Sequence, residues 1–258
     1  MNEIMKFLNS HSSVRHFTEQ AVTDADETNI ITTAQRSPTS SNIQAYSIIS
    51  IRDKRHKEQI ADWAGDQKHI VQAPLFLVFC ADLFRLRTLN DERDYPYDGG
   101  FTELFIQATV DTALVAGRAL QAAQALGMGG VMVGGIRNKI EELSELLELP
   151  ELVYPVMGMS LGYPDKEPLI KPRLPQEAIS FKERYDAEAF DEPIKEYDDT
   201  ILHLGYLKGR EVRPEDYPDF EGVYSWSEHT ARRMANLEGT VMRRHMLSYL
   251  QERGFLLK

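Results

Sequence analysis

A chain of 258 residues, 42% hydrophobic and 27% charged, has the composition of an ordinary globular protein with one large core. Its formal net charge of −11 argues against broad binding to nucleic acid or anionic membranes, so we expect neither as a partner. The single cysteine, Cys80, excludes an intrachain disulfide. Without a signal peptide or an apolar run that could span a bilayer, the sequence predicts a soluble cytoplasmic protein.

Predicted helices and strands alternate through the first 160 residues, which is typical of an α/β sandwich. In chain order they are a helix at 4–8, a helix at 24–34, a strand at 46–51, a helix at 54–64, a strand at 75–80, a helix at 101–126, a strand within 129–137, a helix through 143–147 and a strand at 153–159. Thr23 and Asp26 resemble a capping box at the start of the second helix. Residues 85–100 are polar, and we expect them to form a mobile loop before the long helix.

The long helix at 101–126 organises the rest of the chain. It has no proline, is rich in alanine, and ends before Gly127, which stands where a C′ glycine belongs. Its continuous apolar face comprises Leu104, Phe105, Ala108, Thr112, Val115, Ala119, Ala122 and Leu126. Because the helix is apolar all round, we expect a second subunit to cover part of it.

Beyond residue 176 the composition changes, with more charges and tyrosines and no apolar runs. Only Ser227 to Arg253 reads as a solid helix, closed by Gly254. We therefore divide the chain into a core at 1–175 and an extension at 176–258 that packs over the core and belongs to the same domain.

Two glycine pairs, Gly129–Gly130 and Gly134–Gly135, flank an apolar strand and would let a flat ligand lie against the backbone. Several common sites are excluded. The glycines lack the G-x-G-x-x-G spacing of a dinucleotide fold, and no Walker motif occurs. The seven histidines form no metal-ligand motif, and no serine lies in G-x-S-x-G.

Two basic clusters remain, one with His11, Ser13 and Arg15 and the other with Lys171 and Arg173. Taken alone, these clusters are more simply explained as solvated surface charge. A phosphate monoester carries nearly two negative charges, which two arginines, a lysine and hydroxyl donors would match. Together with the hydroxyl-rich loop at 36–42 and the glycine pairs, these clusters indicate a site for a mononucleotide flavin.

Five ordered segments carry a specific resemblance: 11–15, 37–44, 65–69, 129–138 and 171–175. They resemble the nitroreductase family, in its NADPH-dependent flavin reductase and oxygen-insensitive nitroreductase branch, which has a long C-terminal extension. The resemblance implies an α+β fold with a central, mostly antiparallel sheet flanked by helices. It also implies an intertwined homodimer with one FMN at each of two subunit interfaces.

The same resemblance implies the FMN contacts, which are His11, Ser12, Ser13, Arg15, Thr39, Ser40, Gln67, Met132, Val133, Gly134, Gly135, Lys171 and Arg173. The sequence departs from the family at two positions. The family commonly has arginine in place of Ser12 and often serine in place of Thr39. The first departure removes one cation near the phosphate.

The implied activity is an FMN-dependent NADPH oxidoreductase that reduces nitroaromatics, quinones or free flavins by two-electron, ping-pong hydride transfer. The flavin supplies this chemistry, so we assign no catalytic side chain and expect the protein to orient and tune it. We expect Gln67 and the backbone of Gly134 and Gly135 to form hydrogen bonds with the flavin ring. The alternatives are a dedicated NADPH–flavin reductase that supplies FMNH₂ to a monooxygenase, and a flavin-binding protein without turnover.

A short basic stretch in the extension, at 206–213, stands out from its acidic surroundings. We expect Lys208, Arg210 and Arg213 to contact the 2′-phosphate that distinguishes NADPH from NADH. In related enzymes this extension carries basic residues with that role. The alternative is a solvated charged loop.

Overall fold

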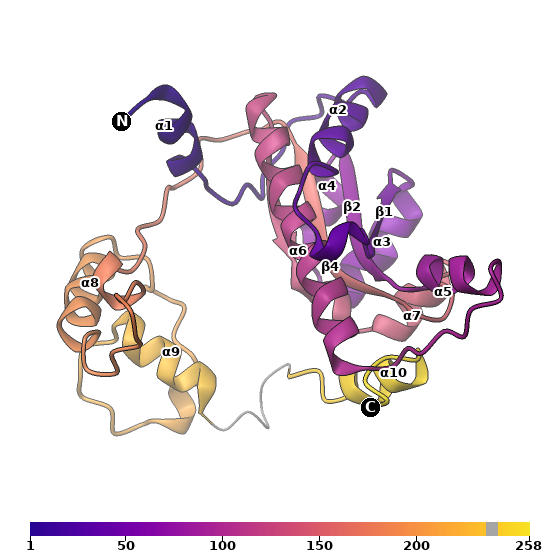
Figure 1. The fold of residues 1–258 in the computed structure, drawn as a ribbon. Coiled ribbons are helices and arrows are strands. Elements are labelled where there is room, and N and C mark those ends of the chain that lie inside the picture. The colour runs from indigo at the N-terminus through magenta and orange to yellow at the C-terminus, as the bar shows by residue number, and fades with distance from the viewer. Residues whose placement is uncertain (236–241) are drawn as a thin grey trace. The chain divides into compact units, whose positions relative to one another are not determined.

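The computed structural model describes residues 1–235 and 242–258, which form two compact units. The first unit comprises residues 1–169 and 243–258, and the second comprises 170–242 (Figure 1). The chain therefore leaves the first unit after Leu169 and returns to it at Arg243. Among the described residues, no helix has the length and apolarity needed to cross a bilayer.

The first unit is built on a four-stranded antiparallel sheet. In spatial order its strands are β1 (Tyr46–Ile51), β2 (Leu75–Asp82), β4 (Val153–Gly162) and β3 (Gly129–Val133). β2 is central, with Phe79 opposite Ile48 of β1 and Leu77 opposite Met159 of β4. Because neighbouring strands run in opposite directions, the fold is α+β. The expected class is confirmed, although the alternation of elements alone had indicated an α/β sandwich.

The helices of the first unit are α1 (Glu3–Asn9), α2 (Asp24–Ala34), α3 (Lys54–Trp63), α4 (Lys68–Gln72), α5 (Phe84–Asp91), α6 (Thr102–Ala125), α7 (Ile140–Leu146) and α10 (Met246–Glu252). Two 3₁₀ turns accompany them, η1 (Ser40–Asn42) and η2 (Gly134–Arg137). The second unit holds α8 (Asp191–His203), α9 (Trp226–Met234), η3 (Gln176–Ala178) and η4 (Pro214–Asp216).

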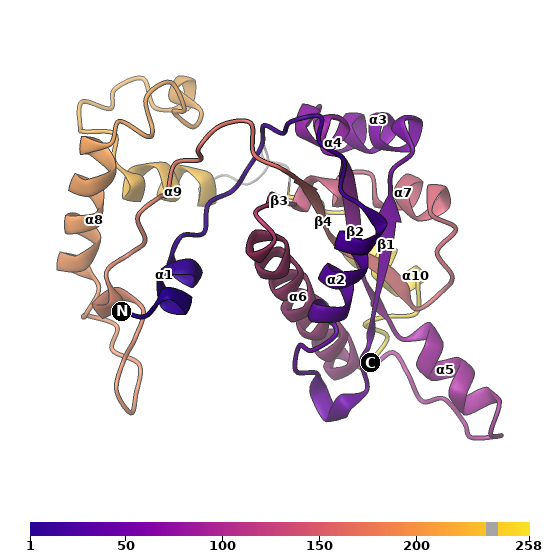
Figure 2. The same cartoon turned by 90° about the horizontal axis from the view of Figure 1, so that it is seen from above.

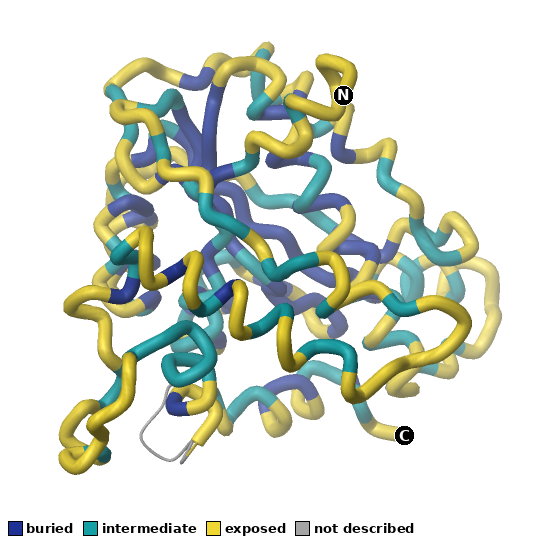
Figure 3. Tube along the Cα trace, turned by 90° about the vertical axis from the view of Figure 1, so that its left-hand side faces the viewer, coloured by how far each residue is buried: buried dark blue, intermediate teal, exposed yellow. Residues whose placement is uncertain are grey.

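Helices cover both faces of the sheet (Figure 2). Side chains alternate along β2, so Leu75 and Leu77 pack with α2 and α6, whereas Phe76 and Val78 pack with α3, α4 and α7. Every residue of β2 is buried, and buried stretches appear dark blue in the interior of the tube in Figure 3. Fully burying one such side chain stabilises the fold by about 1.5–3 kcal/mol, so β2 is a main source of stability.

The long helix α6 has 24 residues and lies along the α2 face of the sheet. Most of the predicted apolar face is buried, including Ala108, Val115 and Ala119, but Leu126 is exposed. Gly127 has φ +79°, which confirms its place as the C′ residue. A second apolar stripe, made of Ile106, Val110 and Leu114, is exposed on the described chain.

Two features of the secondary structure in the first 160 residues were not predicted correctly. α5 occupies 84–91, where a mobile loop was expected, and the five-residue α4 was missed because it is too short to show a period. The strand expected within 129–137 is confirmed as β3, which ends at Val133, where the chain turns into η2. The predicted capping box is confirmed, since Thr23 accepts from the Asp26 backbone and Asp26 from that of Thr23.

The helix expected from Ser227 to Arg253 is also wrong, and α8 was missed altogether. α9 ends at Met234, and Arg243 has a positive φ of 46° before α10 begins. Residues 236–241 of that predicted helix lie outside the described residues. The two helices also belong to different units, because α10 packs into the first unit whereas α9 belongs to the second. Gly254 closes α10 with φ +87°, as expected.

The second unit has its own small core of Tyr197, Ile201 and Leu207. The rings of Tyr197 and Trp226 meet edge to face, with centroids 5.2 Å apart, and join α8 to α9. Arg232 of α9 is buried, and its guanidinium carbon lies 4.4 Å from the ring centroid of Tyr217. Aromatic and cation–π contacts therefore help to hold this unit together.

Candidate functional site

The N-terminal basic segment lies beside the first glycine pair. The backbone N–H of Val14 donates to the carbonyl of Gly130 at 3.0 Å, and Ser13 forms a parallel bridge to the same glycine. A Cβ on Gly129 would lie 2.4 Å from Cγ2 of Val14, so only glycine permits this approach. The structure therefore joins 11–15 to the 129–135 strand and turn, two segments the sequence keeps far apart.

Side chains in that segment differ in their freedom to bind a ligand. Ser12 is buried, and its hydroxyl donates to the carbonyl of Leu169 at 2.7 Å. His11 lies with Nδ1 3.2 Å from Nε2 of Gln124 on α6. Arg15 is exposed and makes no hydrogen bond or ion pair within the described chain. Arg15 is thus the cation of this segment that is available to an anion.

The hydroxyl-rich loop is held by a buried carboxylate on α6. Oδ1 of Asp111 accepts the backbone N–H of Ser40 at 2.9 Å, and Oδ2 accepts that of Ala45 at 3.4 Å. Thr39 and Ser40 then border a groove of 360 Å³ whose other wall includes Val110 and Leu114. Asp111 was not among the residues predicted from the sequence, although a carboxylate on the buried face of an alanine-rich helix was a signal.

Gln67 lies at the centre of a hydrogen-bonded chain. Its Nε2 donates to the carbonyl of Ala64 at 2.7 Å, and its Oε1 lies 3.0 Å from Nε2 of His69. The other ring nitrogen of His69 lies 2.9 Å from Oγ of Ser160, in the middle of β4. Burial lowers the pKa of His69 to about 4, and the nearby charges of Arg15 and His16 act in the same direction.

The Gly134–Gly135 turn is pressed against this amide. A Cβ on Gly135 would lie 2.4 Å from Nε2 of Gln67 and 2.5 Å from the carbonyl oxygen of Ala64. Only glycine leaves room for both groups. The structure thus brings Gln67 to the turn that follows Met132 and Val133, although the two segments are far apart in sequence.

The far side of the turn is supported by Arg137, which the sequence analysis gave no role. Its guanidinium donates to the carbonyl of Val156, and burial lowers its pKa. Nε2 of His245 lies 3.0 Å from the carbonyl oxygen of Arg137, and Nε of Arg243 donates to Oδ1 of Asn138 at 2.9 Å. The C-terminal residues therefore brace η2, a long-range contact that no local motif could reveal.

In the second unit, Lys171 and Arg210 both contact Tyr206. Nζ of Lys171 donates to the Tyr206 hydroxyl at 2.7 Å and lies 4.5 Å from the ring centroid. The guanidinium carbon of Arg210 lies 4.7 Å from the same centroid. Arg173 donates only to backbone, at 3.1 Å from the Lys171 carbonyl. Tyr206 therefore contacts both Lys171, a predicted phosphate contact, and Arg210, a predicted NADPH contact.

The three cations predicted to bind NADPH differ in exposure. Lys208 and Arg210 are exposed, whereas Arg213 is half-buried. The Arg213 guanidinium donates to the carbonyls of Arg232 and Ala235 and so caps the C-terminal end of α9. Arg213 therefore has a structural task that the sequence did not indicate.

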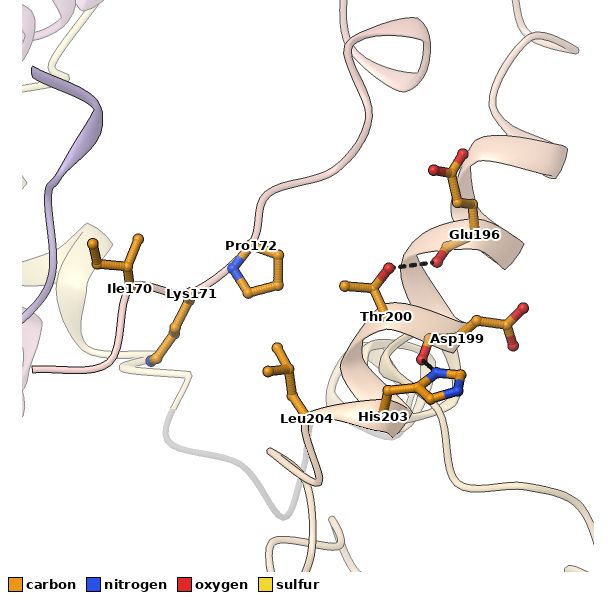
Figure 4. Close-up of a pocket in the computed structure, with 8 residues that line it drawn as sticks. All are labelled: Ile170, Lys171, Pro172, Glu196, Asp199, Thr200, His203 and Leu204. Atoms are coloured by element: carbon orange, nitrogen blue, oxygen red, sulfur yellow. Dashed lines mark hydrogen bonds between the residues drawn. The ribbon is translucent and has the colours of Figure 1, made fainter. Parts of the chain in front are cut away.

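A groove of 720 Å³ separates the start of the second unit from α8 (Figure 4). Lys171 and Pro172 stand on one side, and the α8 residues Glu196, Asp199 and His203 stand on the other. His203 is tied to its own helix, with Nδ1 2.6 Å from the Asp199 carbonyl oxygen. The carboxylates of Glu196 and Asp199 would repel an anion, so this groove is unsuited to binding a phosphate group.

The predicted phosphate contacts share one property. Arg15, Lys171 and Arg173 make no ion pair with a carboxylate in the described parts of the chain, although the net charge is −11. Cations without carboxylate partners in an acidic protein match the donor set of a phosphate monoester. Within residues 1–235 and 242–258, no group of three or more His, Cys, Asp or Glu side chains could hold a metal ion.

Comparison with known proteins gives consistent matches along the chain. The model of the nitroreductase family matches residues 8–163, and that of the nitroreductase family C-terminal domain matches 171–258. An oxygen-insensitive NADPH nitroreductase of Salmonella typhimurium is 36% identical over 256 residues, which cover 99% of each chain. An FMN reductase [NAD(P)H] of Bacillus subtilis is 39% identical over 208 residues, 76% of this chain and 83% of that one. The structure of an NADPH:FMN oxidoreductase from Vibrio harveyi, complexed with NAD⁺, has a TM-score of 0.85 at 32% identity and covers 100% of both chains.

Proposed function

Because this chain belongs to the nitroreductase family, we propose that it is an FMN-dependent NADPH oxidoreductase that reduces nitroaromatics, quinones or free flavins. The observation that carries the flavin assignment is the set of three cations, Arg15, Lys171 and Arg173, none of which pairs with a carboxylate in the described chain. Relatives named for NADPH nitroreductase and FMN reductase activity support the reaction class.

The FMN phosphate would be held by these three cations, with Ser13 and the hydroxyls of the 39–40 loop as further donors. A charge-assisted hydrogen bond to a phosphate oxygen is about twice as strong as a neutral one. The Ser12 hydroxyl already donates to Leu169, so it would contribute less than its neighbours. The donor set therefore favours a phosphorylated flavin over riboflavin.

The flavin ring would lie against the 132–135 segment, with Gln67 at its edge. When bound, FMN accepts a hydride from NADPH and passes two electrons to the acceptor. The protein's own groups would orient the ring, exclude water and supply hydrogen bonds, so no side chain acts as acid, base or nucleophile. NADPH and the acceptor would use the same face in turn, which gives ping-pong kinetics.

Lys208 and Arg210 are the exposed cations that would read the 2′-phosphate of NADPH. Arg213 would act mainly by holding α9, because its guanidinium is bound to backbone carbonyls there. The extension at 176–258, as expected from the sequence, would pack over the core and the partner subunit.

A homodimer is proposed from the exposed apolar stripe on α6. Ile106, Val110 and Leu114 stand on one face of this helix, and the groove beside them is bordered by Thr39 and Ser40. A second copy seated on the stripe would bury it and would lie next to the 39–40 loop. This arrangement supports a flavin site at the subunit interface. A cytoplasmic location stays a prediction from the lone, unpaired Cys80.

A dedicated flavin reductase is the second candidate, because two relatives from Bacillus subtilis are named FMN reductase. The two functions differ in the fate of the electrons. A dedicated reductase would turn over free FMN far faster than quinones or nitroaromatics at equal concentration, whereas a general oxidoreductase would accept all three.

The test begins with the visible spectrum of the purified protein, before and after incubation with FMN and gel filtration. We expect a bound oxidised flavin and steady NADPH consumption with a quinone, a nitroaromatic and free FMN as acceptors. A protein that takes up no flavin would contradict the proposal. A protein that binds FMN but stops after one turnover would instead be a flavin carrier.

A further inference from the structure

We propose that Ser160 and His69 are positioning residues that fix the direction of the Gln67 carboxamide, so that it offers an N–H donor to the flavin ring rather than a carbonyl. The inference rests on the proposed function, because Gln67 borders the ring only if FMN binds at the Gly134–Gly135 turn. Neither Ser160 nor His69 is itself among the predicted FMN contacts.

The direction of the carboxamide in the structure is identified by its contact with the carbonyl of Ala64. A backbone carbonyl oxygen can only accept a hydrogen bond, so the amide atom 2.7 Å from it must be the nitrogen of Gln67. The carboxamide oxygen then faces His69, at 3.0 Å from Nε2. A rotation of the amide by 180° would place two acceptors against each other at Ala64.

The histidine tautomer follows from that direction. His69 is buried and its pKa is lowered to about 4, so at neutral pH the ring carries one N–H. The carboxamide oxygen of Gln67 only accepts, so the proton belongs on Nε2 of His69. Nδ1 is then an acceptor, and the fully buried hydroxyl of Ser160, 2.9 Å away, is the donor that satisfies it.

Ser160 is a firm starting point for this chain of hydrogen bonds. It lies in β4 opposite Phe76 of β2 and Val131 of β3, so the two neighbouring strands hold its backbone. The order of donation is Ser160 to His69, His69 to Gln67, and Gln67 to Ala64. A rigid sheet thereby sets the direction of a side chain at the edge of a turn.

One N–H of the Gln67 amide is left over. A primary amide has two, and Ala64 takes one of them. The amide nitrogen lies against Gly135, where a Cβ would come within 2.4 Å of it. A donor near the ring stabilises the electron density that the ring gains on reduction, whereas a carbonyl there would oppose it. This chain of hydrogen bonds from Ser160 through His69 to Gln67, which we call the relay, should therefore favour binding of reduced over oxidised FMN.

The first test uses flavin-free protein and needs no activity. Nitrogen NMR of protein labelled with ¹⁵N-histidine reports which ring nitrogen carries the proton. At pH 7 we expect His69 to be protonated on Nε2, and Ser160→Ala to mix the two tautomers. A wild-type His69 protonated on Nδ1 would overturn the proposal.

The second test compares the dissociation constants of oxidised and reduced FMN, with melting temperature recorded for every variant. His69→Leu and Ser160→Ala should shift the ratio of the two constants by about tenfold toward oxidised FMN, equivalent to about 30 mV for a two-electron couple. His69→Gln keeps an amide N–H that can reach Gln67 and should stay within about threefold of wild type. Ser144→Ala, which removes another buried serine hydroxyl, at 2.6 Å from the Tyr249 hydroxyl, is the matched control and should leave the ratio unchanged.

The outcomes separate the relay from the function. Wild-type ratios in both His69→Leu and Ser160→Ala would overturn the relay while leaving the oxidoreductase intact. If one variant fails to fold, the other together with His69→Gln still decides the question. A wild-type protein that binds no FMN would contradict the proposed function instead, and the NMR measurement would still decide the direction of the hydrogen bonds.

Discussion

Oδ1 of Asp111 accepts the backbone N–H of Ser40 at 2.9 Å, so a carboxylate only 1% exposed in the middle of α6 fixes the loop at the proposed flavin site. The second oxygen reaches the N–H of Ala45. A helix that stabilises the core therefore also determines the shape of a binding loop 71 residues earlier in the chain.

Asp111→Asn should be destabilising, because the amide can accept only one of the two backbone N–H groups and sets a donor against the other. We expect a loss of about 1–3 kcal/mol in the free energy of unfolding, measured by urea denaturation. Glu103→Gln, an exposed carboxylate on the same helix, is the control and should change stability little. Equal stability of the two variants would show that the loop does not depend on Asp111.

Arg173→Ala should weaken FMN binding by about 1.5–3 kcal/mol, or roughly 10–150-fold, because it removes a charge-assisted bond to the phosphate. Riboflavin, which has no phosphate, should bind equally poorly to both proteins. Quenching of flavin fluorescence measures both affinities. Arg184→Ala removes an exposed arginine of the same unit and should bind FMN as wild type does. Retention of FMN by Arg173→Ala through dilution and gel filtration would refute the assignment.

The double variant Lys208→Ala, Arg210→Ala should lower the preference for NADPH over NADH by about 10–100-fold in kcat/KM, or 1.4–2.8 kcal/mol. The contact is remote from the hydride, so KM for NADPH should rise while kcat changes little. Steady-state assays with both nucleotides at low and high salt measure the effect. Arg213→Ala should instead lower the melting temperature, because it uncaps α9. An unchanged NADPH preference in the double variant would clear these two residues of the role.

Stability should depend on pH through His69, whose pKa is lowered to about 4 from an ordinary 6.5. Between these values the unfolded chain binds a proton that the native protein does not. The contribution is complete above pH 6.5 and is lost as the pH falls toward 4, by up to roughly 3 kcal/mol. Urea unfolding at several pH values measures this slope, and His69→Gln, which does not titrate there, should show a flatter one. Identical slopes would mean that folding does not lower the pKa of His69.

Leu114→Glu should dissociate the proposed homodimer, because it places a charge on the exposed stripe of α6 that a second copy would bury. Sedimentation at micromolar concentration should show a dimer for wild type, with an interface above roughly 2,000 Å², and a smaller species for the variant. Leu89→Glu is a matched control, since Leu89 is 42% exposed on α5 and Leu114 is 44% exposed. A monomeric wild-type protein with bound FMN would refute this interface.

Sequence reasoning succeeded where the signal is local. The strand at 46–51 and the capping box at Thr23 were predicted from residues within each element, and both agree with the structure. It failed where a residue's role depends on a distant partner. Nothing near His69 in the sequence indicates Ser160, which is 91 residues away, and nothing near Arg137 indicates His245.

The helix predicted from Ser227 to Arg253 shows the same limit. The structure places α9 and α10 in different units, which the sequence of this stretch does not indicate. For Arg213, charge alone favoured a ligand contact. Its guanidinium instead donates to the backbone carbonyl of Arg232 in α9, and that need for a donor is evident only in the folded structure.

The return of the chain to the first unit after residue 242 makes the second unit an insertion rather than a tail. The backbone N–H of Leu152 donates to the carbonyl of Arg253 at 2.8 Å, and that of Leu257 donates to the carbonyl of Gly100 at 2.7 Å. The last residues are therefore hydrogen-bonded to the rest of the first unit. Removing the final sixteen residues would therefore damage the sheet-bearing unit, whereas excising 170–242 and joining the cut ends would spare it. Lys171 and Arg173 stand at the start of this inserted segment, and Lys208 and Arg210 stand further along it. A change confined to the later part of the segment would therefore alter the proposed NADPH contacts and leave the proposed phosphate contacts in place.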